Sequence, residues 1–267
     1  MTTRGAIAAF FDLDGTILPA PSLEWRFASY LDQAGLFNLP GWIAYALKNV
    51  PRDPLGAIFR NKSYVAGLPE TLAADWARSA GRCHARAAFS WQASVTREGL
   101  PFFAPALDRI AWHASEGHRI FLISGTLAPL ARAFAQELLH RLDGMVPAEA
   151  SSLTQPAIEV CATELELRNS CWTGRLAGPH ITGEAKARCI HMLAARDGIV
   201  LGESYAYGNS FADVAMLETA GHPAAVNPSM RLARRARRRG WEIEWWRDRP
   251  TANNISAVKF PIAKGAR

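Results

Sequence analysis

The strongest constraint on the fold of this chain is a series of short apolar runs, each followed at once by a polar turn. Runs of this length bounded by turns are typical of buried strands. Strands that alternate with helices predict an α/β fold, a doubly wound parallel sheet covered by helices on both faces. The predicted strands are residues 6–11, 119–123, 204–207 and 223–226, and the helical patterns between them are 127–141, 184–197 and 211–220.

A long insert separates the first predicted strand from the second. Residues 19–100 are too many for a plain loop in a compact domain. We interpret the insert as a helical cap on a core made of residues 1–18 and 101–250, followed by a C-terminal tail, 251–267. Prolines punctuate its helix-like segments, which are 22–37, 40–49, 53–66 and 69–89. We also predict a small β-flap over residues 157–176.

The composition indicates a globular protein. The chain has 267 residues, of which 49% are hydrophobic and 20% charged, and no apolar stretch is long enough for a membrane-spanning helix. The apolar segment near the start is short and carries the motif that begins at Asp12, so we expect no secretory signal. The four cysteines form neither a CxxC pair nor a zinc-like cluster, which predicts reduced, mostly buried thiols and a cytoplasmic protein.

The most informative motif is Asp12-Leu13-Asp14-Gly15-Thr16, which follows the first predicted strand. A carboxylate can attack phosphorus and form an acyl phosphate. A second carboxyl two residues away can protonate the leaving oxygen and then deprotonate water. Two adjacent carboxylates repel one another, so a divalent cation and a lysine would be needed to hold them ionised. An ordinary Asp-Gly turn is the alternative interpretation.

Polar groups also follow the next predicted strands. Ser124-Gly125-Thr126 is expected to open a helix and to cradle phosphate, or simply to cap that helix. Lys186, early in a predicted helix, could neutralise the nucleophile and the phosphoryl oxygens, or could be a solvated lysine. The carboxyl ends of parallel strands are where such sheets bind ligands.

The segment Gly208-Asn209-Ser210-Phe211-Ala212-Asp213 follows the third predicted strand. Its oxygen-bearing side chains could complete a site for a hard cation, together with water and phosphate. A capped helix N-terminus is the alternative.

Together these motifs resemble the haloacid dehalogenase superfamily of phosphatases. DLDGT looks like its first motif, ISGT its second, Lys186 its third and GNSFAD its fourth, so that the resemblance covers roughly residues 6–228. The position of the insert resembles the helical cap of the phosphoserine-phosphatase-like branch. That branch implies a Rossmann-like core with the active site under the cap.

The resemblance implies that Asp12 is the nucleophile and Asp14 the general acid and base. Mg²⁺ would be bound by Asp12 and the main-chain carbonyl of Asp14. Asn209 stands where the family has an aspartate, so Asp213 is expected to carry more of the metal binding. The residues expected at the phosphate or substrate are Ser124, Gly125, Lys186, Thr16 and Arg60, and those expected at the metal are Asp12, Asp14, Asn209 and Asp213.

We therefore predict a Mg²⁺-dependent phosphomonoester hydrolase that acts through an aspartyl-phosphate on a small metabolite or lipid-derived phosphate. A phosphotransferase with the same nucleophile is one alternative. A catalytically weak phosphate-binding or membrane-associated module is another, supported only by Asn209. Pro21 stands at the position where phosphoserine phosphatases hold the ammonium of the substrate with a glutamate, which argues against phosphoserine. Candidate cap contacts are Ser22, Glu24, Arg26, Arg60 and Lys62.

An arginine-rich segment remains outside this scheme. Residues 231–239 hold six arginines in a chain whose net charge is +6. They are interpreted as a solvated helix or, with the tryptophans 241, 245 and 246, as a contact with an acidic membrane. No DNA- or RNA-binding motif accompanies them, so we expect no nucleic-acid partner.

Overall fold

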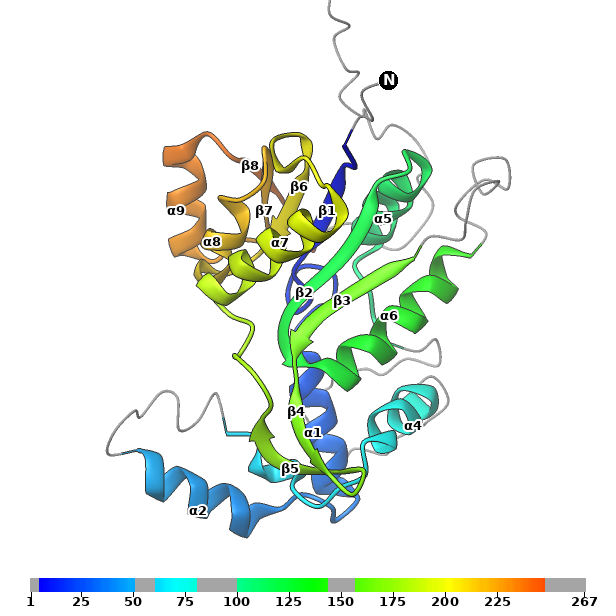
Figure 1. Cartoon of the computed structure of the whole chain (residues 1–267), viewed down its shortest axis with the longest axis vertical. Helices are drawn as coiled ribbons and strands as arrows, with labels where there is room; N and C mark the ends of the chain where they lie inside the picture. Colours follow the sequence, from blue (N-terminus) through cyan, green and yellow to red (C-terminus); the bar gives the residue numbers. More distant parts are fainter. Residues whose placement is uncertain (1–4, 51–60, 81–99, 144–156, 248–267) are drawn as a thin grey trace, which may run out of the picture.

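The computed structural model describes residues 5–50, 61–80, 100–143 and 157–247. Its centre is a six-stranded sheet in the order β3-β2-β1-β6-β7-β8, in which all neighbouring strands are parallel (Figure 1). The predicted α/β fold with a parallel sheet is confirmed. The strands are β1 (Ala8–Phe11), β2 (Arg119–Leu127), β3 (Ile158–Thr163), β6 (Tyr205–Gly208), β7 (His222–Val226) and β8 (Glu242–Glu244).

Helices cover both faces of this sheet because successive side chains of β1 point to opposite faces and all are apolar. Ala9 and Phe11 belong to the core cluster under α5 and α6, whereas Ala8 and Phe10 belong to the cluster under α7, α8 and α9. Figure 1 shows the two groups of helices on either side of the strands. Their bounds are α5 (Ala104–Ser115), α6 (Ala128–Leu142), α7 (Glu184–Asp197), α8 (Val214–Leu217) and α9 (Met230–Arg239).

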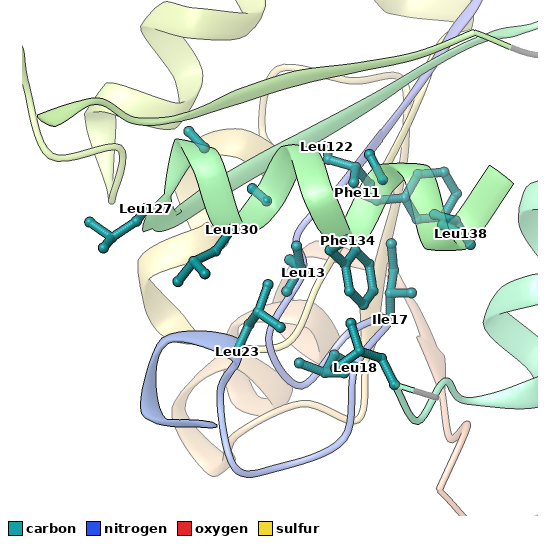
Figure 2. Close-up of a cluster of buried hydrophobic side chains, with 14 of the residues drawn as sticks. Phe11, Leu13, Ile17, Leu18, Leu23, Leu122, Leu127, Leu130, Phe134 and Leu138 are labelled. Carbon is teal, nitrogen blue, oxygen red and sulfur yellow. The ribbon is translucent and has the colours of Figure 1, made fainter. Parts of the chain in front are cut away.

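The insert after β1 is helical where the structure describes it. The loop after β1 packs its leucines and isoleucine against α6, with Leu13 and Leu23 beside Leu130 and Phe134 in Figure 2. The predicted helix 53–66 lies mostly outside the described residues, as does the end of 69–89. The boundaries expected for core, cap and tail stay predictions, and the tail itself lies outside the described residues. The elements are α1 (Leu23–Gln33), α2 (Leu39–Asn49), η1 (Ser63–Val65) and α4 (Thr71–Ala80).

The predicted β-flap is divided between two sheets. Its first strand, β3, extends the central sheet, while β4 (Leu165–Arg168) and β5 (Cys171–Leu176) form an antiparallel hairpin. The hairpin contacts the insert through the main chain of Trp172. Its main-chain N–H donates to the carbonyl of Leu68, and its carbonyl accepts from the main-chain N–H of Gly67. A Cβ at Gly174 would lie 2.7 Å from the Cα of Ser63, so only glycine permits this approach.

Strand β8 was not among the predicted strands, since its sequence, Glu-Ile-Glu, carries little apolar signal. Pairing with β7 gives it its strand conformation. Within the described ranges, none of the helices is both long enough and apolar enough to cross a bilayer.

The prediction of reduced thiols is wrong for two of the four cysteines. Cys161 of β3 and Cys189 of α7 form a disulfide with Cα atoms 6.9 Å apart. Their 28-residue separation gives no sign of this pairing in the sequence, because only the packing of α7 against the sheet brings them together. Cys171 is free, and Cys83 lies outside the described residues. The expectation of a cytoplasmic protein, which partly depended on reduced thiols, stays a prediction.

A buried histidine makes the stability of this fold sensitive to pH. Burial, with His118 and Arg109 nearby, lowers the pKa of His113 from 6.5 to about 2. Below pH 6.5 the unfolded chain therefore binds a proton that the folded chain does not, and stability falls as the pH falls. Between pH 7 and pH 5 this effect lowers the free energy of unfolding of the wild type by about 2 kcal/mol. We expect His113→Gln to be free of that part of the loss.

Urea unfolding of both proteins at the two pH values measures this difference. The same change at an exposed histidine of α7, His191→Gln, is the matched control. An equally steep loss of stability in His113→Gln would contradict the assignment.

Candidate active site

The central group of the site is the carboxylate of Asp12, directly after β1. Its main-chain N–H donates to the carbonyl of Tyr207 at 2.9 Å, which continues the pairing with β6. The side chain is only 8% exposed. Oδ1 accepts from Nζ of Lys186 at 2.5 Å, and Oδ2 accepts from the hydroxyl of Thr16 at 3.1 Å. The nucleophile and lysine predicted from the sequence therefore lie in direct contact, with Thr16 beside them.

Lys186 lies between two carboxylates. It is in the first turn of α7, is 3% exposed, and its Nζ also donates to Oδ1 of Asp213 at 2.6 Å. Burial alone would lower the pKa of Lys186, but Asp12 and Asp213 raise it well above its ordinary value. Burial and the charge of Asp213 raise the pKa of Asp12 to about 7, against the opposing effect of Lys186. The trio holds two acids and one permanent cation out of water.

Both carboxylate oxygens of Asp213 accept hydrogen bonds from the protein. Its Oδ2 accepts from the main-chain N–H groups of Asn209 and Ser210 and from the Ser210 hydroxyl, at 3.1, 2.8 and 2.8 Å. Its other oxygen accepts from Lys186. The expected metal-binding role of Asp213 stays a prediction, and its contacts favour a role in holding Lys186 and the loop after β6.

Asp14 connects three parts of the chain. Its Oδ1 accepts from the main-chain N–H of Leu23, at the start of α1, at 2.7 Å. Its Oδ2 accepts from the hydroxyl of Thr126, on β2, at 2.7 Å. Burial raises the pKa of Asp14, although both hydrogen bonds favour the ionised form. A carboxyl with a raised pKa in a fixed position suits proton transfer.

Sequence reasoning missed the contact of Thr126 with Asp14. The segment Ser124-Gly125-Thr126 was expected to open a helix, but β2 continues to Leu127 and α6 begins at Ala128. Neither hydroxyl caps α6, so the capping alternative is wrong. The register of β2 against β3 shifts between Ser124 and Leu127, so no regular spacing in the sequence indicates that Thr126 faces Asp14.

Ser124 and Gly125 form a rigid part of β2 beside this carboxyl. The Ser124 hydroxyl is buried and accepts from the main-chain N–H of Thr126 at 3.1 Å. The carbonyl of Gly125 accepts from the Thr163 hydroxyl at 2.8 Å. A Cβ at Gly125 would come within 3.3 Å of the His180 ring. The phosphate-binding roles expected of Ser124 and Gly125 stay predictions.

Gly15 brings Asn209 against the loop of the first motif. Gly15 has a φ of +84°, and a Cβ there would lie 1.9 Å from Nδ2 of Asn209. The carboxylate of Asp12, the main-chain carbonyl of Asp14 and the amide oxygen of Asn209 are all hard oxygen donors, so this set fits Mg²⁺. No group of three His, Cys, Asp or Glu suited to a metal occurs in the described part of the chain. In such a site the amide at position 209 would contribute an oxygen without a charge.

The predicted cap contacts have partners within the protein. The Ser22 hydroxyl caps α1. The Arg26 guanidinium donates to the carbonyls of residues 19, 20 and 21. Glu24 accepts from Nζ of Lys62 at 2.5 Å and from the Tyr64 hydroxyl at 2.8 Å. Arg60 lies outside the described residues.

Comparison with known proteins identifies the family. The family model for haloacid dehalogenase-like hydrolases matches residues 9–218. The protein named phosphoserine phosphatase SerB1 from Mycobacterium tuberculosis is 29% identical over 262 residues, covering 97% of this chain and 78% of that protein.

Two solved structures show the same fold. A protein of unknown function from Bordetella pertussis has a TM-score of 0.65 and 24% identity, over 90% of this chain and 99% of that one. A phospho-aspartyl intermediate analogue of phosphoserine phosphatase has a TM-score of 0.54 and 16% identity, over 91% and 94%. The chain therefore belongs to the haloacid dehalogenase-like hydrolases, and it is a phosphatase of that family.

Proposed function

We propose that this phosphatase is a Mg²⁺-dependent phosphomonoester hydrolase with Asp12 as its nucleophile. The observation that supports this proposal most directly is the buried contact of Asp12 with Lys186 at the carboxyl end of β1. β1 and β6 are neighbours in the sheet, and the chain winds outward from them in opposite directions. Ligands of doubly wound sheets bind at such a switch point.

The reaction would proceed in two displacements. In the first, Asp12 attacks phosphorus, the bond from phosphorus to the ester oxygen breaks, and the leaving oxygen takes a proton from Asp14. This leaves an aspartyl-phosphate. In the second, water gives a proton to Asp14 and attacks phosphorus, which releases phosphate and regenerates Asp12.

Two side chains and a metal ion would support these steps. Lys186 keeps Asp12 oriented and offers positive charge to the phosphoryl oxygens. Thr126 fixes the rotamer of Asp14 through its 2.7 Å hydrogen bond. Mg²⁺, held by Asp12, the carbonyl of Asp14 and Asn209, would neutralise charge on the phosphoryl group when bound.

The contacts of Glu24 within the insert favour a substrate other than phosphoserine. Glu24 is the acid nearest to the first motif in the insert, and its carboxylate already accepts from Lys62 and Tyr64. A carboxylate neutralised in this way is a poor partner for the ammonium of an amino acid. We infer a small metabolite or lipid-derived phosphomonoester without an ammonium group at that position.

The nucleophile is tested by Asp12→Asn. Lys186 keeps its ion pair with Asp213 in this variant, so the fold should persist. We expect Mg²⁺-dependent hydrolysis of p-nitrophenyl phosphate to fall by a factor of roughly 10³ or more. Wild type quenched in acid should carry a hydroxylamine-sensitive phosphate that the variant lacks. Asp32→Asn, the same change on an exposed acid of α1, is the matched control. Turnover near wild type in Asp12→Asn would refute the assignment.

The positioning role of Thr126 is tested by Thr126→Val and Thr126→Ser. Valine removes the hydrogen bond to Asp14, and hydrogen bonds to charged groups contribute enough to predict a fall in kcat of roughly tenfold to a hundredfold. Serine keeps the hydroxyl and should restore most of kcat. KM should change little in either variant. Equal kcat values for valine and serine would show that the hydrogen bond does not matter.

The amide at position 209 predicts a metal site of low charge. Asn209→Asp adds a carboxylate of nearly the same shape, so we expect activity to be retained and the half-saturating Mg²⁺ concentration to fall several-fold. Asn169→Asp, in the exposed turn of the β4–β5 hairpin, adds the same charge elsewhere and should leave the Mg²⁺ requirement unchanged. Loss of all activity in Asn209→Asp would contradict the prediction.

A further inference from the structure

The outer face of α9 is a dense array of positive charge. Leu232, Ala233 and Ala236 are buried against the core, which turns the arginines outward. Four of these arginines, together with Phe211, line an open basic groove of about 320 Å³. The residues of this basic groove are Phe211, Arg231, Arg234, Arg235 and Arg238.

Most of this charge is not neutralised within the described ranges. Glu218 pairs with Arg235 and Arg239, at 2.6 and 3.0 Å. No other ion pair of an α9 arginine with a described carboxylate is found, which leaves four of the six arginines uncompensated. Such a cluster attracts anionic surfaces.

Exposed apolar side chains also lie at the edge of the sheet from which α9 starts. Phe211 is 44% exposed, Met230 74% and Trp245 55%. They follow β6, β7 and β8, which are neighbouring parallel strands, so all three lie at the carboxyl edge of the sheet. Basic side chains beside exposed aromatic and aliphatic ones are typical of surfaces that bind the bilayer interface.

We propose that the basic groove and these three apolar residues dock the protein on an acidic phospholipid bilayer. This inference goes beyond the proposed function and does not depend on it. A bilayer is favoured over single-stranded nucleic acid for two reasons. The Arg231 guanidinium lies 4.3 Å from the centre of the Phe211 ring and occupies one of the two faces on which a base could stack. Met230, the most exposed of the three apolar residues, has no ring on which a base could stack. Phe211 is two residues from Asn209, so docking would bring the active-site edge of the sheet close to the lipid.

Vesicle co-sedimentation tests this docking. The full chain is mixed with vesicles of phosphatidylcholine alone, or with equal parts of phosphatidylcholine and phosphatidylserine. We expect binding only to the acidic vesicles, weakened by salt. Arg234→Glu with Arg238→Glu should weaken binding roughly tenfold or more.

Arg168→Glu with Arg175→Glu is the matched control. It makes the same change of charge on exposed arginines of the β4–β5 hairpin and should bind nearly as wild type. Met230→Ser should weaken binding without changing its dependence on salt, because it removes apolar insertion alone. The Arg234/Arg238 variant should hydrolyse soluble p-nitrophenyl phosphate at the wild-type rate, which separates this test from that of the nucleophile.

Three results would overturn the proposal. Wild type could fail to bind acidic vesicles, or the two double variants could bind equally. Tighter binding of wild type to single-stranded polynucleotide than to acidic vesicles would assign the basic groove to nucleic acid instead.

Discussion

The active-site end of this structure depends on one buried cation, Lys186, held between the carboxylates of Asp12 and Asp213. The three residues come from the loop after β1, the first turn of α7 and the turn after β6. A buried charge is tolerated only when it is paired and hydrogen-bonded. Removing the cation would leave two buried carboxylates without the counter-ion that they share. The contact that positions the proposed nucleophile therefore also ties three elements together.

The parallel sheet makes this meeting possible. The carboxyl ends of parallel strands lie at one edge, so each polar turn is delivered to the same place. The apolar clusters on the two faces leave that edge as the place where polar groups can gather. Hydrogen bonds from Ser210 and from the main chain of Asn209 hold Asp213 there, and Thr16 holds Asp12. The side chains that we propose as catalytic groups are thus oriented by the protein itself.

Asp14 connects this group of polar side chains to the insert. It accepts from the main chain of Leu23 at the start of α1 and from Thr126 on β2. The leucines of the loop after β1 pack on α6, and the β4–β5 hairpin contacts the insert near Leu68. Asp14, the proposed general acid and base, is therefore held at the junction between the core and the first helix of the insert. Any movement of that helix would change the surroundings of Asp14 directly.

The sequence by itself determined the parallel sheet, most of the helices and the acids of the first motif. These follow from local periodicity and from turn residues, which act over a few neighbouring positions. The contact of Asp12 with Lys186 is expected from the placement of Lys186 early in a predicted helix and from the resemblance of both motifs to those of the family, and the structure confirms that the two side chains meet.

Only the tertiary structure decided the features that depend on contacts between distant segments. The disulfide joins residues 28 apart, and the hydrogen bond of Thr126 to Asp14 spans 112 positions. Strand β8 exists because β7 offers it an edge, and β2 continues through Ser124 because β3 pairs with it there. No local pattern encodes such contacts, since their free energy comes from packing that forms only when the whole chain has folded.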